Sequence, residues 1–561
     1  MMRSLRCLLV RISRMLVVLA VLVPVVTSAR GQLNFLSRYY QDQAHRYVRL
    51  PPTSVKGLVK DGKLHLSEKQ AIEMALHYNL GVNVQRVQYL YDGWTARSEE
   101  GIYDPSGSFG LDWSRRRTPT TSVLAGGTQL TDVLTTYNLG YQQLWSTGTS
   151  LNVTFTGSRD RTTNLFASLI PAINTSFEVM VSQDLLQGFG RVLPDYQIEI
   201  SRNNLKVSLQ QFRSLAAQTI LQVQNQYWEL AYALEDIRVK QKSLESANTL
   251  LQQNRDRLEV GTASRLDVTQ AEAQVALFRG QLIASQYNYR LAQDQLVTTI
   301  TDYQDPRQFT QEIVPADSVY SPPPVTEAFQ QLQATAYQQR PELQQADLQL
   351  ENSRVTLTQS RNRLRPSLNL QVGYQQFGLG GTEIVRDYSQ GIFNAPIIAI
   401  VPGGLGQSLH QLFSGTYYGY VVQANLQFPI FNTEARALSA QAQIDLNRNE
   451  LSKANLEQSV ALEIRQALTQ IEQSRASLAA AVPGVTAAQA ALAGEEAKFE
   501  AGLATTRDII DAQRDLLTAE EVRVRAQIDL IEAYAALDHA VGQTFERHSI
   551  RLMEAIETNV H

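Results

Sequence analysis

One uninterrupted stretch of the sequence limits the fold more than any other feature: no proline or glycine occurs from Asp195 to Val260. As an α-helix, at ~1.5 Å per residue, this stretch would be roughly 100 Å long, more than the width of a globular domain. Apolar residues recur in it every seven positions, at Leu209, Ala216, Val223, Leu230, Ile237, Leu244, Leu251 and Leu258. Apolar residues with a seven-residue repeat remain in contact with a partner helix only if the two helices form a left-handed supercoil. The sequence therefore predicts a long coiled coil. On this evidence alone, a generic rod-like coiled coil would be enough to explain the pattern.

The turn that ends this stretch occurs twice in the chain. Arg257–Gln274 reads RLEVGTASRLDVTQAEAQ, and Lys498–Asp515 reads KFEAGLATTRDIIDAQRD. When the two stretches are aligned at Gly261 and Gly502, acidic residues and alanines of one stretch match acidic residues and alanines of the other. A helix that ends in a left-handed residue needs glycine there. Each copy is therefore predicted to be the end of a helix followed by a sharp reversal.

Each reversal leads into a shorter helix that returns along the long one. The return helices are expected at 265–301 and 507–541, each roughly 55 Å long. A second long helix is predicted at 433–501. It contains Pro483-Gly484, where we expect a kink or break because proline removes a backbone hydrogen bond. Each half of the chain then forms an antiparallel hairpin with its tip at the glycine turn.

Before each long helix the sequence alternates apolar and polar residues, as in Phe109, Leu111 and Trp113, which predicts strands at about 106–185 and 367–428. A soluble β-sandwich would alternate in the same way. Segments of about ten residues, aromatic residues at strand ends and polar loops favour a transmembrane barrel. The surface loops are expected at Thr118–Thr131 and Gly378–Ser414. Two strands in the second half and up to four in the first cannot close a barrel, so several chains would have to share one.

Both halves of the chain have the same predicted order: a leading helix, a Pro-Ser dipeptide, strands, a long helix, a glycine turn and a return helix. The leading helices are expected at Ser67–Glu100 and Pro324–Arg363. Such an internal two-fold repeat overrules the domain count that length alone suggests. The predicted domains are a leader at 1–29, an N-terminal extension at 30–65, a first repeat at 66–301, a linker at 302–324, a second repeat at 325–545 and a tail at 546–561.

The N-terminus reads as a secretory leader, with an uncleaved anchor helix as the alternative. Four arginines precede the apolar run Met15–Val26, and Thr27-Ser28-Ala29 offers small residues for cleavage. Cys7, the only cysteine, lies inside this leader, so the mature chain leaves the cytoplasm without a disulfide framework. Lys+Arg number 50 and Asp+Glu 54, and this balance gives no indication of nucleic-acid binding. No apolar run after the leader is long enough to predict a spanning helix.

Several short motifs occur in a fixed order along the chain. They are Leu66-Ser67 with Ala71, Ala75-Leu76 and Asn79, then Gln183–Gly190, Arg340–Leu343, and the two tips Leu258–Gly261 and Phe499–Gly502. Together these motifs resemble the TolC family of outer-membrane efflux and secretion ducts. The similarity covers about Leu66 to Phe545. It implies an α+β membrane protein: a homotrimer whose chains share one barrel in the outer membrane of a Gram-negative-type bacterium, continued by a periplasmic barrel of coiled-coil hairpins. A periplasmic adaptor and an inner-membrane pump, of the resistance-nodulation-division, ABC or a similar class, would dock at its lower end.

The resemblance also implies functional residues near the tips. Adaptor contacts would fall on Val260, Gly261, Thr262, Ala501, Gly502 and Leu503. An acidic ring that narrows the tunnel entrance would fall on Asp508 and Asp511, with only Asp267 in the first repeat. Three chains would place six carboxylates around the axis, which raises the pKa of some of them and attracts cations.

This sequence departs from the family near the proposed gate, and two of the acidic residues have an alternative role. Phe499 and Ala504 occupy the positions where the family has a tyrosine and an arginine that hold the closed state, so a latch of that kind is not expected. Asp267 and Asp508 each lie three residues after a hydroxyl residue, which is also the pattern of a helix N-terminal cap. Asp511 lies beyond the cap and has no such alternative role.

The chain is not expected to be an enzyme or to need a cofactor or metal. Its seven histidines show no metal-ligand spacing, and the glycines at 403–406 lack the lysine of a phosphate loop and read as a flexible loop. The leading hypothesis is a passive exit duct in outer-membrane lipid, with a duct dedicated to a protein or polymer as an alternative of the same fold. A secreted coiled-coil scaffold with a soluble β domain is the alternative from another class.

Overall fold

The computed structural model describes residues 59–60, 63–120, 128–164, 166–190, 195–302, 311–389, 391 and 395–550. The predicted leader, Cys7 and most of the N-terminal extension lie outside these residues. All described residues belong to one compact unit, Pro52–His561.

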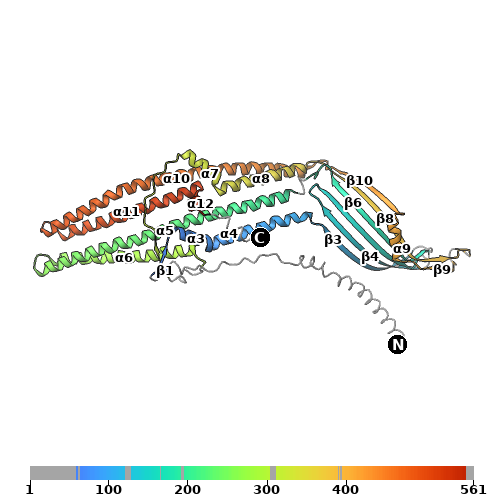
Figure 1. The fold of residues 1–561 in the computed structure, drawn as a ribbon, viewed down its shortest axis with the longest axis horizontal. Helices are drawn as coiled ribbons and strands as arrows, with labels where there is room; N and C mark the ends of the chain where they lie inside the picture. Colours follow the sequence, from blue (N-terminus) through green and yellow to red (C-terminus); the bar gives the residue numbers. More distant parts are fainter. Residues whose placement is uncertain are drawn as a thin grey trace, which may run out of the picture. The chain divides into compact units, whose positions relative to one another are not determined.

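Two long antiparallel hairpins make up most of the unit (Figure 1). Their helices are α5 (Tyr196–Glu259), α6 (Arg265–Ile300), α10 (Thr433–Glu500) and α11 (Thr506–Val541). With 64 residues, α5 is about 96 Å long. The hairpins lie side by side through α5 and α11, whose facing residues Val239 and Val524 belong to one buried cluster.

The second long helix runs through its proline without the break that the sequence led us to expect. α10 is continuous from Thr433 to Glu500 with Pro483 inside it. Proline costs about 3 kcal/mol in a helix interior. Ala481 and Val485, on either side, are both buried, and packing of this kind offsets the lost hydrogen bond. α10 also contains an apolar 18-residue window with a mean hydropathy of 1.4, long enough to cross a membrane by composition alone. In the described structure, however, α10 packs lengthwise on α11 and forms the second hairpin with it.

Each leading helix, expected as a single helix, is divided in two. The four helices are α3 (Glu68–Tyr78), α4 (Leu80–Glu100), α7 (Phe329–Gln339) and α8 (Pro341–Asn362). Asn79 leaves the helical conformation and its side chain accepts a hydrogen bond from the Val82 N–H at 3.1 Å, which starts α4. Arg340 is extended, with ψ 122°, because Pro341 disfavours the helical conformation at the residue before it. α4 then lies along α5, and α8 lies along both α5 and α10.

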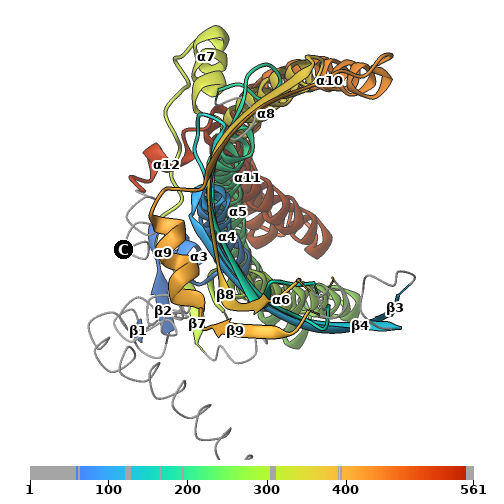
Figure 2. The ribbon, with the colours of Figure 1, turned by 90° about the vertical axis from the view of Figure 1, so that its right-hand side faces the viewer.

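Six long strands from both halves of the chain form one antiparallel sheet. They are β3 (Ser106–Pro119), β4 (Gln129–Leu144), β5 (Thr149–Thr162), β6 (Leu169–Asp184), β8 (Ser367–Arg386) and β10 (Tyr418–Gln427), and a short seventh, β9 (Ile397–Val401), pairs with β8. The order of the six is β10-β8-β6-β5-β4-β3, so β3 and β10 are its edges. The sheet is strongly curved (Figure 2).

The two regions expected as surface loops contain regular structure. In the first region only the ends are regular, since β3 continues to Pro119 and β4 begins at Gln129, and residues 121–127 lie outside the described part of the chain. In the second region β8 continues to Arg386 and is followed by β9 and by α9 (Leu405–Phe413). α9 packs on the sheet because glycines leave room for it: a Cβ at Gly378 would lie 2.0 Å from the Ser408 carbonyl oxygen. The glycines at 403–406, interpreted as a flexible loop, instead begin α9, with Gly404 as its N-cap.

The segment expected as a linker at 302–324 also contains a strand. β7 (Glu312–Pro315) pairs in parallel with β2 (Lys63–Leu66), which pairs with β1 (Val59–Lys60). This small sheet packs on α5 in the largest buried cluster, where Tyr227 and Trp228 are 0% and 1% exposed. Two short helical segments, η2 (Gly101–Tyr103) and α12 (Thr544–Arg547), complete the described elements.

Candidate functional site

The first hairpin tip is a tight turn closed by backbone hydrogen bonds. Gly261 has φ +78°, a conformation that L side chains rarely adopt. The N–H groups of Thr262 and Ala263 both donate to the Arg257 carbonyl oxygen, at 2.8 and 3.2 Å. Val260 is 74% exposed, and no atom lies within 4 Å of a Cβ built on Gly261. The turn is therefore free to contact another molecule.

The second tip has the same geometry. Gly502 has φ +73° and open space around it. The Leu503 N–H donates to the Lys498 carbonyl oxygen at 2.8 Å, and the Leu503 side chain is 81% exposed. Each tip thus presents one bare aliphatic side chain beside a glycine.

Asp267 and Asp508 both cap the return helices. The Asp508 carboxylate accepts hydrogen bonds from the Thr505 N–H at 2.8 Å and the Thr505 hydroxyl at 2.7 Å. Asp267 does the same with Ser264, at 2.9 and 2.7 Å. These hydrogen bonds lower the pKa of both carboxyl groups below its ordinary value, so both are charged at neutral pH.

Asp511 is free of any capping role and lies between two cations. Its carboxylate oxygens are 3.8 Å from the Arg507 Nε and 3.9 Å from an Arg514 Nη, both at the outer limit of an ion pair. All three side chains are more than half exposed. The sequence pattern singled out the carboxylates and not these arginines, although the arginines lie four residues before and three residues after Asp511, spacings that place them on the same helix face.

A contact between the two hairpins lies just above the tips. The Arg257 guanidinium stacks over the Phe499 ring at 3.9 Å and donates to the Phe499 carbonyl oxygen at 3.0 Å. Phe499 is buried, and Ala504 packs in the same cluster. The family resemblance matched Phe499 and Ala504 to residues that hold the closed state, and no such polar contact was expected here. At Phe499 the structure has a contact between an arginine and an aromatic ring, which the sequence did not indicate.

Further along the hairpins, one arginine holds three carboxylates. Arg525 contacts Glu229 at 2.6 Å, Asp529 at 2.7 Å and Glu532 at 3.1 Å. Its guanidinium also lies 5.1 Å from the Tyr232 ring. Burial, and then the charges of Glu229 and Asp529, raise the pKa of Glu532 to about 7, and the attraction of Arg525 only partly opposes this. Since Glu229 and Tyr232 belong to α5, the cluster joins the two hairpins.

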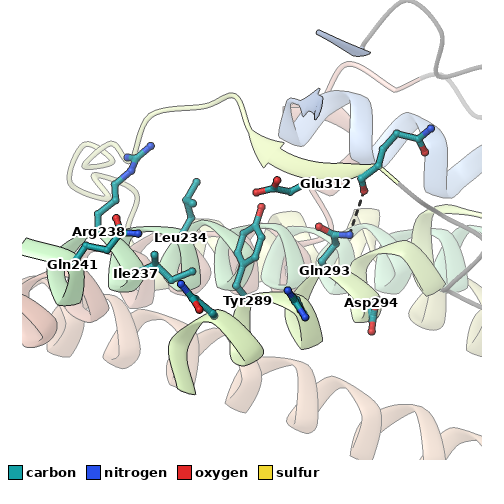
Figure 3. Close-up of a pocket in the computed structure, with 11 residues that line it drawn as sticks. Leu234, Ile237, Arg238, Gln241, Tyr289, Gln293, Asp294 and Glu312 are labelled. Atoms are coloured by element: carbon teal, nitrogen blue, oxygen red, sulfur yellow. Dashed lines mark hydrogen bonds between the residues drawn. The ribbon is translucent and has the colours of Figure 1, made fainter. Parts of the chain in front are cut away.

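A groove of about 740 Å³ lies between α5, α6 and β7 (Figure 3). Its central polar groups already have partners: the Tyr289 hydroxyl donates to the Ile313 carbonyl oxygen at 2.5 Å. The Gln293 side chain donates to the Gln311 carbonyl oxygen at 3.3 Å and accepts from the Ile313 N–H at 3.1 Å. These contacts fasten β7 to α6, so the groove is a structural seam. Among the described residues, no group of three His, Cys, Asp or Glu side chains is placed to hold a metal ion.

The six-stranded sheet has one apolar and one polar face. Cross-strand pairs on the first face join Leu139 to Phe155, Val153 to Val179 and Tyr374 to Tyr420. On the other face, the Gln375 amide donates to Glu178 at 3.0 Å, and Asn369 donates to Asp184 at 2.8 Å. A sheet with this alternation suits lipid on one side and water on the other.

The sequence matches the family model described as outer membrane efflux protein, over residues 149–300 and 332–543. The chain belongs to this family. The outer membrane efflux protein BepC of Brucella suis is 24% identical over 65% of this chain and 71% of its own. TolC of Vibrio cholerae is 24% identical over 67% of this chain and 81% of its own.

The fold is that of solved outer-membrane channels. The CmeC channel of Campylobacter jejuni superposes with a TM-score of 0.60 at 14% identity, covering 92% of this chain and 94% of that one. VceC of Vibrio cholerae gives a TM-score of 0.57 at 15% identity, covering 85% and 96%. This outer membrane efflux protein is thus an α+β protein of the outer membrane with a large periplasmic part, and the family is one of efflux channels rather than enzymes. The alternative of a secreted scaffold finds no support.

Proposed function

We propose that three copies of this chain form one exit duct that passively conducts substrates from a periplasmic adaptor and an inner-membrane pump to the exterior. One observation carries the proposal: the sheet of the single chain is open, and its edges β3 and β10 run in opposite directions. Open edges are not tolerated in lipid. Edge strands of opposite direction let each copy continue the antiparallel pattern of the next, until the barrel closes.

The number of strands indicates the width of such a duct. Three copies contribute eighteen strands, six from each. Barrels of 16–18 strands leave an aqueous channel, whereas about eight strands leave a filled interior. With its polar face inward, the barrel would hold water.

The tips and the acidic residues supply the periplasmic end of the proposal. We infer that the adaptor contacts Val260, Gly261 and Thr262 of one tip and Ala501, Gly502 and Leu503 of the other, because both turns are bare. We further infer that Asp508 and Asp511 narrow the entrance, with Asp267 beside them on the first hairpin. The deprotonated state of Asp508 and the exposure of Asp511 suit an electrostatic filter for cations.

Purification in detergent followed by planar-bilayer recording tests the proposal. We expect particles with the mass of three chains and stable single-channel currents. Extraction without detergent, as a monomer that carries no current, would overturn both the trimer and the duct.

A further inference from the structure

The charged side chains of the sheet are sorted by face. α9 lies against the convex side of the sheet (Figure 2). It contacts Thr175 and Gly378 there, and the Thr175 and Ser408 hydroxyls lie 2.7 Å apart. Thr175 shares its face with Phe177 and Val179, since alternate residues of a strand point the same way. The convex face is therefore the apolar one.

Four arginines extend this convex face beyond its apolar band. Register places Trp113, Thr135 and Arg159 in one row across β3, β4 and β5. The next row on the same face joins Arg115, Val133 and Arg161. Arg117 follows two residues later on β3. The four are Arg115, Arg117, Arg159 and Arg161, all exposed. They lie toward the ends of the strands that are remote from α4 and α5 (Figure 1).

No acidic residue accompanies them on their face of β3–β6. The five carboxylates of these strands, Asp112, Asp132, Asp160, Glu178 and Asp184, all have the opposite parity and lie on the concave rows. Among the described residues, none of the four arginines forms an ion pair. Four uncompensated guanidinium groups on a lipid-facing surface need an anionic partner from outside the chain.

The position of the group indicates the partner. The helices are periplasmic, so the remote strand ends reach the outer leaflet. Trp113, 67% exposed, lies one row below Arg115 and Arg161, at the level where tryptophan marks a membrane interface. Arginine binds phosphate through two parallel hydrogen bonds. β3 and β5 are separated by one strand, about 10 Å, which leaves room for a headgroup with more than one phosphate.

We propose that Arg115, Arg117, Arg159 and Arg161 form a binding site for a phosphate-bearing lipid of the outer leaflet. The inference rests on the proposed function in one respect, that the strands span the membrane. The lipid would cover the seam between copies, because β3 is an edge strand of the sheet. It would thereby contribute to holding neighbouring chains together.

Lipid A, a glycolipid with two phosphates, is a suitable probe for native mass spectrometry of the detergent-purified protein. The test variant carries Arg115→Gln, Arg117→Gln, Arg159→Gln and Arg161→Gln together. Arg116→Gln is the matched control, since Arg116 lies between two of these residues on the opposite face. We expect about 1,000-fold weaker binding in the test variant, at about 1 kcal/mol for each of the four arginines. Arg116→Gln and wild type should bind lipid A equally, and both should lose affinity for its dephosphorylated form.

Equal binding by wild type and the test variant would overturn the site. So would equal affinity for lipid A with and without its phosphates. A test variant that no longer forms trimers even in detergent free of lipid A would show that the arginines contact the next copy of the chain instead. Currents recorded in bilayers of uncharged lipid separate the two proposals, because the duct should conduct there whether or not the lipid site exists.

Discussion

At the scale of single residues, Asp508 has a structural role that must be separated from any role in the gate. Its carboxylate caps α11 through Thr505, whereas Asp511 makes only long contacts with Arg507 and Arg514. A loss of function on removing Asp508 could therefore come from a frayed helix. A variant that removes the cap but keeps both carboxylates resolves this.

We predict that Asp508→Ala with Asp511→Ala raises single-channel conductance, because the side chains that narrow the entrance become smaller. Block by multivalent cations should weaken, because the entrance loses its negative charge. Thr505→Ala is the control: it removes the cap at a cost of about 1 kcal/mol of helix stability but keeps both carboxylates. Planar-bilayer recording measures both quantities. Unchanged cation block in the double variant, or the same change in Thr505→Ala, would favour capping as the only role.

The glycine of the second tip gives a residue-scale prediction about docking. Gly502→Val forces a β-branched residue to φ +73°, at a cost of about 1–2 kcal/mol, and places bulk on the bare turn. We expect trimers in the outer membrane at normal levels but loss of export, measured as substrate accumulation in cells. Gly280→Val is the control, since Gly280 is exposed within α6 and has ordinary helical geometry.

Two outcomes of this comparison would contradict the docking role. Normal export by Gly502→Val would mean that no partner needs the turn. Loss of the trimer itself would mean that the glycine serves folding.

At this scale the sequence could predict what local chemistry determines. Gly261, Gly502 and the caps are set by residues within a few positions of each other. The tie between Arg257 and Phe499 could not be predicted, because its partners are 242 residues apart in the chain. Only the packing of one hairpin on the other brings them together.

At the scale of elements, the long helices begin and end within a few residues of their predicted bounds, because capping and glycine signals coincide with the apolar periodicity. α9 was missed for a physical reason. Gly378 and Gly380 are typical of loops in sequence, whereas in the structure they lie in strand β8. Because they have no side chains, the backbone of α9 can pack directly against the strand there. Tertiary packing decided a segment whose local sequence favours a loop.

The cluster around Arg525 leads to a prediction about the seam between hairpins. The folded chain raises the pKa of Glu532 to about 7 from an ordinary value of 4.5, so it binds this proton more tightly than the unfolded chain does. The contribution is fully present below pH 4.5 and is lost as pH rises to about 7. Glu532→Gln, which stays neutral, should flatten the fall in thermal midpoint between pH 5 and 7.

The matched control is Glu272→Gln. Glu272 also pairs with an arginine, Arg255 at 2.7 Å, but both side chains are about half exposed, so it should leave the pH profile unchanged. Thermal unfolding in detergent, followed by circular dichroism across this range, measures both variants. A Glu532→Gln profile that parallels wild type would show that Glu532 is already charged in the fold.

At the scale of the whole molecule, the alternation of the strands predicted a two-faced sheet, but not its extent. The sequence left open whether all four strands of the first half join those of the second. The register shows that they do, since β6 pairs with β8 from Leu169 to Asp184. Pairing between strands so far apart in the chain is a property of the assembled sheet, which no local window of sequence contains.

The shared barrel makes a prediction that this chain is well suited to test, because Cys7 is its only cysteine and lies in the predicted leader. Each variant carries Ser114→Cys on β3 together with one of Val421→Cys, Gln423→Cys or Asn425→Cys on β10. If β3 of one copy pairs with β10 of the next, one of these variants should form disulfides between neighbouring copies. All four positions belong to the concave face, and a disulfide requires Cβ atoms about 3.5–4.5 Å apart.

Non-reducing denaturing gels should show species of up to three chains that reductant returns to one. Asn152→Cys, on the interior strand β5, is the control and should give no cross-link with the same partners. Failure of all three Ser114→Cys pairs, or equal cross-linking by the control, would contradict a barrel closed through these edges.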